Sequence, residues 1–224
     1  MISYLWETYN MDLFLGIITL VILIFSAILH EVAHGFVAER FGDPTARLAG
    51  RLTLDPRKHI DPMMSIALPI LTFISSGGTF VIGAAKPVPV DPFNLKEGRK
   101  DLALVSLAGP LTNVIIAILA GFLIHILYLN TPSFFIGTSP IGFILINIVR
   151  LNLLLAIFNL IPIPPLDGSK IFSLILPEKL ANAFLSLGSI GIFIIFFLLL
   201  SGGELSLGRL IFSLLSFSEK LLGL

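Results

Sequence analysis

Long apolar segments alternate with short polar segments along the whole chain. A helix of about 20 apolar residues can cross a lipid bilayer, and four segments reach that length: residues 12–37, 101–129, 141–161 and 180–200. Polar residues, prolines or glycines separate these segments, as is typical of helix ends. The pattern predicts an all-α polytopic membrane protein with about four spanning helices. We expect residues 1–224 to form a single integral-membrane domain.

The segments between the spans predict further structure. Residues 63–82 are apolar but contain the sequence Ser-Ser-Gly-Gly, which breaks helices. Residues 46–54 favour short extended strands near the membrane interface, and the alternating prolines of residues 86–90 impose an extended strip. These stretches either pair with an unwound substrate by β-augmentation or only connect helices. Residues 204–224 space their apolar side chains as an amphipathic interfacial helix does.

Composition agrees with a lipid environment. Hydrophobic residues make up 56% of the chain and charged residues 12%, whereas soluble domains contain about 25% charged residues. Basic and acidic residues balance at 14 each, and there is no Lys/Arg-rich tail, so we expect no nucleic-acid partner. The absence of cysteine excludes disulfides, a thiolate zinc site and a cysteine nucleophile.

A candidate metal site lies near the end of the first apolar segment, in the sequence His30-Glu31-Val32-Ala33-His34. Histidines four residues apart share one face of a helix, so both can reach one zinc ion. Glu31, beside the first histidine, can then act as general base for hydrolysis. Such a pattern arises by chance on polar helix faces of soluble proteins. Ionisable residues inside a membrane segment, in contrast, are rare and indicate function.

A catalytic zinc site takes three protein ligands, and without cysteine the third must be His, Asp or Glu. Asp167 is the stronger candidate, because it follows a proline-broken helix end in an apolar environment, where unwound backbone lines a cavity or is buried. Gly168 allows the chain to approach closely there. The alternative role for Asp167 is to cap the helix that begins near Ser169. His59 and His125 are lone histidines and are better interpreted as interfacial residues.

Two separated sequences carry a resemblance to a known family. HEVAH at residues 30–34 and FNLIPIPPLDG at residues 158–168 together resemble the site-2 protease family of intramembrane zinc metalloproteases. KPVPV at residues 86–90 and LAGPLTN at residues 107–113 are similar to the compact, prokaryotic-type members, which lack PDZ and CBS domains. The resemblance extends over nearly the whole chain.

The resemblance implies roles for the metal-binding and reactive residues of the two motifs. It implies one zinc ion per chain, with His30, His34 and Asp167 as its ligands. Glu31 is then the general base. Asn159, at the start of the second motif, helps to hold the substrate or the oxyanion.

The ligands constrain the direction of the helices. Ligands to one ion share one depth, and both His30 and Asp167 lie at or just beyond the end of a helix, so these two helices run in the same direction. An odd number of crossings must separate them. Residues 101–129 supply one crossing, so we expect residues 63–82 to be re-entrant or tilted. Basic residues then gather on the cytoplasmic side of the cell membrane, with the N-terminus outside and the active site nearer the cytoplasm.

Three other polar side chains lie within apolar segments. We expect Asn113 and Asn152 to form hydrogen bonds between helices. Arg150 lies about 10–15 Å into its helix, at 1.5 Å per residue. It either lines a water path to the zinc, pairs with Glu7 or Asp12, or extends toward the interface.

Together these observations predict an intramembrane zinc endopeptidase. It would hydrolyse peptide bonds within or near transmembrane segments, in regulated intramembrane proteolysis or in clearance of membrane remnants, with transmembrane proteins and the lipid bilayer as partners. The alternative is a non-catalytic membrane zinc protein or pseudoprotease scaffold. Glu31 argues against a scaffold, because a structural site needs no base. A peptidase for soluble peptides and a transporter fit less well, since the HEVAH sequence is in a membrane segment and no inverted repeat is visible.

Overall fold

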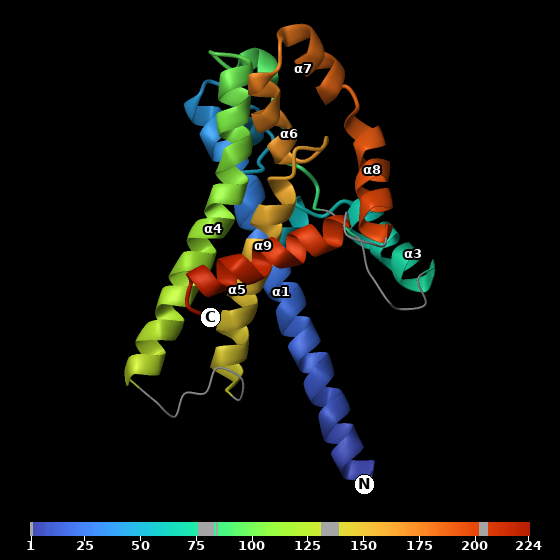
Figure 1. Cartoon of the computed structure of the whole chain (residues 1–224), viewed down its shortest axis with the longest axis vertical. Coiled ribbons are helices and arrows are strands. Elements are labelled where there is room, and N and C mark those ends of the chain that lie inside the picture. The colour runs from blue at the N-terminus through green and yellow to red at the C-terminus, as the bar shows by residue number, and fades with distance from the viewer. Residues whose placement is uncertain (1, 76–82, 84, 131–138, 202–205) are drawn as a thin grey trace.

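The computed structural model describes residues 2–75, 83, 85–130, 139–201 and 206–224. Its framework is formed by α1 (Ile2–Arg40), α4 (Arg99–Asn130) and α5 (Pro140–Asn159). Helices α1 and α5 run in the same direction, and α4 runs in the opposite direction and packs against both (Figure 1). Each of the three is apolar and long enough to cross a membrane. The prediction of a mostly helical, polytopic membrane protein is therefore confirmed.

The fourth predicted span, residues 180–200, is not one straight helix. It falls in α7 (Glu178–Leu185) and α8 (Gly188–Leu200), and the two helices meet at a 72° bend. Gly188 has a φ of +27°, a value outside the helical region, and it interrupts the helix at this point. The described residues thus contain three spans, or four if the bent pair counts as one.

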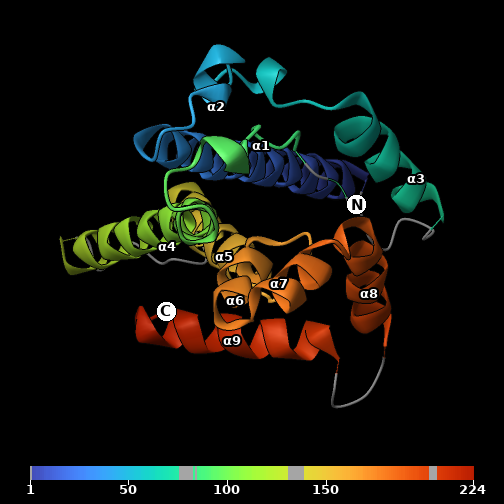
Figure 2. The same ribbon diagram turned by 90° about the horizontal axis from the view of Figure 1, so that it is seen from above.

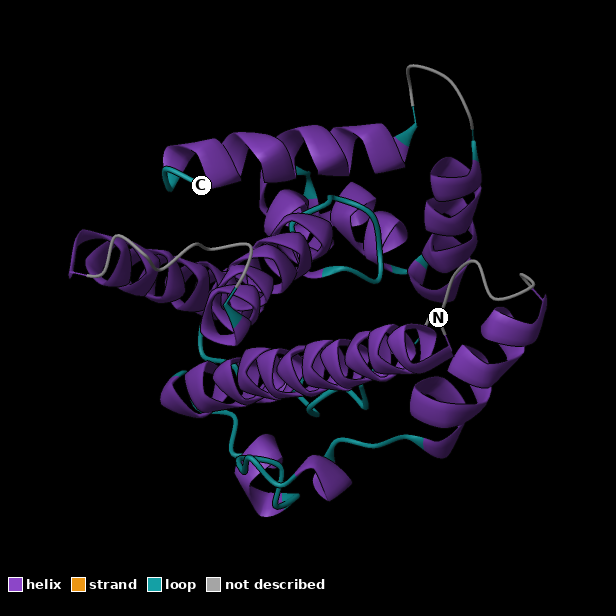
Figure 3. Ribbon diagram, turned by 90° about the horizontal axis from the view of Figure 1, so that it is seen from below, coloured by secondary structure: helices purple, strands orange, loops and turns teal. Residues whose placement is uncertain are grey.

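Short helices connect the long ones. They are α2 (Thr45–Leu48), η1 (Pro56–Lys58), η2 (Pro62–Ala67), α3 (Leu68–Ser75), η3 (Pro92–Asn94), α6 (Asp167–Phe172) and η4 (Ser173–Ile175). Figure 3 shows no strand in the part of the chain that the structure describes. The expected strands are therefore not confirmed, and residues 46–54 instead form the end of one helical turn followed by bends. Residues 86–90 are extended as predicted but form no ladder, since two of them are prolines without an N–H group.

The apolar segment of residues 63–82 begins as helix, but its described part is too short to cross the membrane as one straight helix. Helical residues 62–75 number too few to cross a hydrocarbon layer of about 30 Å at 1.5 Å per residue. Residues 76–82 lie outside the described residues. The re-entrant or tilted path of this segment therefore stays a prediction.

The C-terminal helix α9 (Leu207–Leu221) crosses α5, on the opposite side of α5 from α1 (Figures 1 and 2). Arg150 Nε donates to Oε1 of Glu219 at 2.7 Å, so this arginine has a partner that the sequence did not indicate. The Nε2 atom of His125 lies 2.6 Å from the carbonyl oxygen of Leu222. The predicted amphipathic helix is thus present, and these two contacts attach it to α5 and α4.

Small and polar residues lie at the contacts among the three long helices, beside buried aliphatic side chains such as Ile124 and Val149. In lipid, helices gain no hydrophobic free energy from packing, so close approach and hydrogen bonds must hold them together. Ala117 on α4 and Ala156 on α5 are buried, as is Ser26 on α1. The large side chains of Phe14 and Phe25 on α1 are exposed, where they can face lipid.

Asp43 anchors the polar loop that follows α1. Its buried carboxylate accepts hydrogen bonds from the backbone N–H of Asp91 at 2.7 Å and from Nδ2 of Asn94 at 3.0 Å, and Thr45 also donates to it. Burial by itself raises the pKa of Asp43, but the hydrogen bonds from Thr45 and Asn94 outweigh burial and hold the pKa below its usual value. The ionised carboxylate therefore ties this loop to Asp91 and Asn94, which follow the extended strip of residues 86–90.

Candidate metal centre

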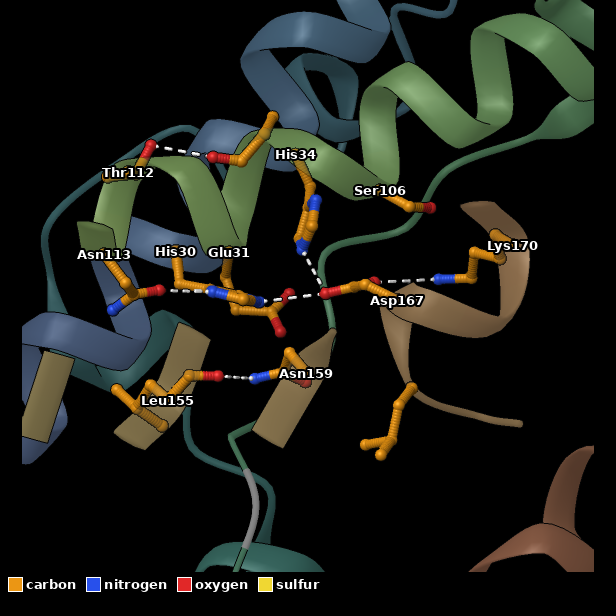
Figure 4. A network of polar contacts seen from close by, with 12 residues as sticks. His30, Glu31, His34, Ser106, Thr112, Asn113, Leu155, Asn159, Asp167 and Lys170 are labelled. Carbon is orange, nitrogen blue, oxygen red and sulfur yellow. Dashed lines mark hydrogen bonds and ion pairs between the residues drawn. The ribbon is translucent and has the colours of Figure 1, made fainter. Parts of the chain in front are cut away.

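Two histidines and one aspartate converge between α1 and α6. His30 and His34 lie one turn apart on α1, and the Nε2 atom of each lies 3.1 Å from Oδ2 of Asp167 (Figure 4). All three residues are buried, and their ligand atoms lie within 4.8 Å of one another. Ligand atoms about 2.0–2.2 Å from a tetrahedral zinc ion are about 3.3–3.6 Å apart. The spacing therefore fits one zinc ion.

The outer nitrogens of both rings face oxygen acceptors. The Nδ1 atom of His30 lies 2.5 Å from Oδ1 of Asn113, and that of His34 lies 2.7 Å from the carbonyl oxygen of Val105. A carbonyl oxygen can only accept, so each Nδ1 carries the hydrogen and each Nε2 presents its lone pair to the shared space. Metal-binding histidines are commonly oriented in this way.

Asp167 faces the histidines rather than capping its helix. Helix α6 begins at Asp167, and no side chain accepts a hydrogen bond from its first turn in the manner of a cap. Lys170 Nζ lies 3.2 Å from Oδ1 of the same carboxylate, so Oδ2 is the oxygen left for the histidines. A Cβ atom at Gly168 would lie 2.1 Å from the carbonyl oxygen of Leu160, which confirms the close approach predicted at this glycine.

Glu31 lies beside His30 at the edge of the ligand group (Figure 4). Its Oε2 atom accepts a hydrogen bond of 2.7 Å from the backbone N–H of Val88. Val88 lies between Pro87 and Pro89, which have no N–H, so this is the amide that the Pro-Val-Pro sequence offers. The extended strip thereby holds the carboxylate next to the ligands.

Amides at the start of this strip and just after it also donate within the chain. Lys86 N–H bonds the carbonyl oxygen of His59 at 2.9 Å, and Asp91 N–H bonds Asp43. Pairing of a substrate strand with residues 86–90 stays a hypothesis, and it would rely mainly on the carbonyl oxygens of the strip.

The remaining candidates lie outside the ligand group. Asn159 is near the site at the end of α5 (Figure 4), but its Nδ2 donates to the carbonyl oxygen of Leu155 at 3.0 Å. His59 is buried within the protein, and its Nε2 lies 2.9 Å from the carbonyl oxygen of Thr53. Within the described part of the chain, His30, His34 and Asp167 are the group of His, Asp or Glu side chains that could hold a metal ion.

Gly109 on α4 completes the site, and sequence reasoning missed its role. A Cβ atom at this position would lie 2.5 Å from Nε2 of His34 and 2.6 Å from Nε2 of His30. The helix backbone therefore approaches both ligand atoms where no side chain could fit. A Gly-Pro pair inside a long apolar helix is the signal that could have indicated this close approach.

Comparison with known proteins agrees with this geometry. The model of peptidase family M50 matches residues 18–138, which is more than half of the chain. The chain belongs to peptidase family M50. The resemblance to the site-2 proteases is thereby confirmed.

Several M50-like relatives cover most of the chain. The protein named "Putative zinc metalloprotease YwhC" from Bacillus subtilis is 38% identical over 181 residues, which are 79% of this chain and 77% of YwhC. Rip2 of Mycobacterium tuberculosis is 38% identical over 72% of this chain, but the match covers 59% of Rip2. MJ0611 of Methanocaldococcus jannaschii is 29% identical over 76% of both chains. No solved structure gives a significant match.

Proposed function

We propose that this M50 peptidase is a zinc endopeptidase that cleaves membrane proteins within or near their transmembrane segments. The observation that carries the proposal is the convergence of His30, His34 and Asp167 at the end of a membrane helix, with the carboxylate of Glu31 beside them. YwhC and Rip2 are named as zinc metalloproteases, in agreement with that ligand set. A scaffold that only binds zinc would need no carboxylate at Glu31.

The proposed mechanism assigns one task to each side chain. His30, His34 and Asp167 hold the zinc ion, which when bound supplies Lewis-acid activation of water and of the substrate carbonyl. Glu31 takes a proton from the attacking water, with Oε2 held by the N–H of Val88 so that Oε1 is the accepting atom. Glu31 then returns this proton to the leaving amine.

Substrate must reach this site in an unwound form, because a peptide carbonyl in a helix is already hydrogen-bonded and shielded. We assign to Asn159 the task of binding the substrate or the oxyanion. Its amide now bonds Leu155 within its own helix, so substrate would replace that contact. Transmembrane proteins cleaved for signalling or for removal of remnants fit these requirements.

The proposed site lies nearer the cytoplasmic side. Basic residues from the last residue of α1 to the first turn of α4 are the basis of this assignment, by the positive-inside rule. They are Arg40, Arg47, Arg51, Arg57, Lys58, Lys86, Lys96, Arg99 and Lys100. Residues 131–140, which follow α4 in the sequence, include no Lys or Arg.

Labelling of single cysteines tests this orientation directly, because the natural chain has none. We expect Lys58→Cys and Lys100→Cys to react only from the cytoplasmic side, and Ser139→Cys, before α5, only from outside. Impermeant maleimides applied to cells and to inverted vesicles measure this. Labelling of Lys58→Cys and Lys100→Cys from opposite sides would refute the topology.

Removal of zinc tests the activity. We expect the purified protein in liposomes to cleave members of a panel of single-span substrates, to lose cleavage with a chelator and to regain it with stoichiometric zinc. Asp167→Asn should lose both zinc and cleavage, because a ligand is weakened, whereas Asp55→Asn in the exposed pair with Arg57 should lose neither. Zinc bound without cleavage of any substrate would favour the scaffold.

A further inference from the structure

A chain of hydrogen bonds leads from His30 across α4 to α5. Asn113, which faces Nδ1 of His30 with its Oδ1 atom, donates from Nδ2 to Oδ1 of Asn152 at 2.8 Å. Asn152 then donates from Nδ2 to Oγ of Ser26 at 2.9 Å and to the carbonyl oxygen of Ile148 at 2.8 Å. Asn113 and Asn152 are fully buried. Bulk water is therefore not available to either amide, and each must find its partners inside the chain.

The last bond in this chain fixes the direction of all the others. The carbonyl of Ile148 can only accept, so the amide nitrogen of Asn152, and not its oxygen, must face it. The oxygen of Asn152 then faces Asn113 and requires the nitrogen of Asn113 there. The oxygen of Asn113 is left for His30, so Nδ1 of His30 must carry the hydrogen. Reversal of either amide would bring two acceptors together, because the backbone carbonyl of Ile148 cannot be reversed.

We propose that Asn152 is a positioning residue that sets the tautomer of His30. Through Asn113 it holds the hydrogen on Nδ1 and keeps the lone pair of Nε2 directed to the metal, although it touches neither metal nor substrate. This role rests on the proposed zinc site. It also accounts for two fully buried asparagines between apolar membrane helices, where small apolar residues would pack without polar groups to satisfy.

Loss of Asn152 frees Asn113 to rotate by half a turn. The nitrogen of Asn113 would otherwise face an apolar side chain without a partner, which is costly for a buried amide. After rotation this nitrogen faces His30 and favours the tautomer with hydrogen on Nε2, so that the atom facing the site has no lone pair for a metal. Zinc affinity then falls even though all three ligands are present.

The test compares zinc affinity among four purified full-length proteins, by competition with a chromophoric chelator. We expect Asn152→Leu to bind zinc about 10- to 100-fold more weakly, as is typical when the partner of a ligand is removed. Asn152→Asp should keep near wild-type affinity, since burial favours its protonated carboxyl group, which can donate to the carbonyl of Ile148 and accept from Asn113. Asn147→Leu is the matched control, because Asn147 is on the same helix and donates only to Phe143 of its own backbone among the contacts seen.

Each outcome decides a different point. Wild-type zinc affinity in a folded Asn152→Leu protein overturns the tautomer role alone. The role is also overturned if Asn152→Asp binds zinc as weakly as Asn152→Leu, because altered packing would then explain the loss of affinity in both variants. Absence of zinc binding in the wild type overturns the proposed function and this role with it. If Asn152→Leu does not fold, Ser26→Ala replaces it: the carbonyl of Ile148 still orients Asn152, so a tenfold loss of zinc affinity there overturns the proposal.

Discussion

We expect replacement of Gly109 by alanine to lower zinc affinity at least about 10- to 100-fold and to lower cleavage with it. The new Cβ would lie 2.5–2.6 Å from ring atoms of His30 and His34, closer than packed carbon atoms come. Neither ring can move away without breaking its hydrogen bond to Asn113 or Val105. Overpacking costs about 1–3 kcal/mol, and a cost of about 1.4 kcal/mol carried by the ligands is tenfold in zinc affinity.

Gly121→Ala is the matched control for this change. Gly121 is also buried in α4, but a Cβ there would lie 3.7 Å from the side chain of Leu222, an ordinary contact. We expect this variant to keep zinc affinity and cleavage. Zinc content by mass spectrometry, together with the rise in melting temperature on addition of zinc, measures both variants. A Gly109→Ala protein with wild-type zinc affinity would mean that α4 does not approach the imidazoles as the structure shows.

The elements that depend on local pattern could be predicted from the sequence. Apolar length alone predicted α4 and α5 nearly to their ends, because a membrane helix must satisfy its backbone internally. It placed the start of α1 at residue 12, whereas the helix begins ten residues earlier, at Ile2. The bend at Gly188 and the ion pair between Arg150 and Glu219 could not be predicted in this way. A single glycine is tolerated in many helices, and the partner of Arg150 is 69 residues away along the chain.

The same distinction between local pattern and tertiary contact applies to the residues of the candidate metal centre. The spacing of His30 and His34 is local and places both rings on one face of α1. The close approach of Gly109, the bond from Lys170 to Asp167 and the path through Asn152 exist only once α4, α5 and α6 are assembled. Sequence reasoning identified ligand candidates by their chemistry, but the residues that orient those ligands have no distinctive spacing of their own.

Glu31→Gln should separate metal binding from chemistry. The glutamine side chain has the same length, and its carbonyl oxygen can accept the hydrogen bond from Val88 that holds Glu31. It cannot take a proton from water at neutral pH. We therefore expect zinc content and melting temperature to stay at wild-type values, while the rate of cleavage falls about 10²- to 10⁴-fold, the usual contribution of a general base.

Glu39→Gln is the matched control, because Glu39 lies on the same helix and pairs with Arg47 at an exposed position. It should cleave as the wild type does. A Glu31→Gln protein that cleaves at the wild-type rate would show that another group takes the proton. If that variant lost zinc together with cleavage, Glu31 would act in assembling the site rather than as a base. If Glu31→Gln retains zinc but loses cleavage while Glu39→Gln stays active, proton transfer is the property that distinguishes Glu31 from Glu39.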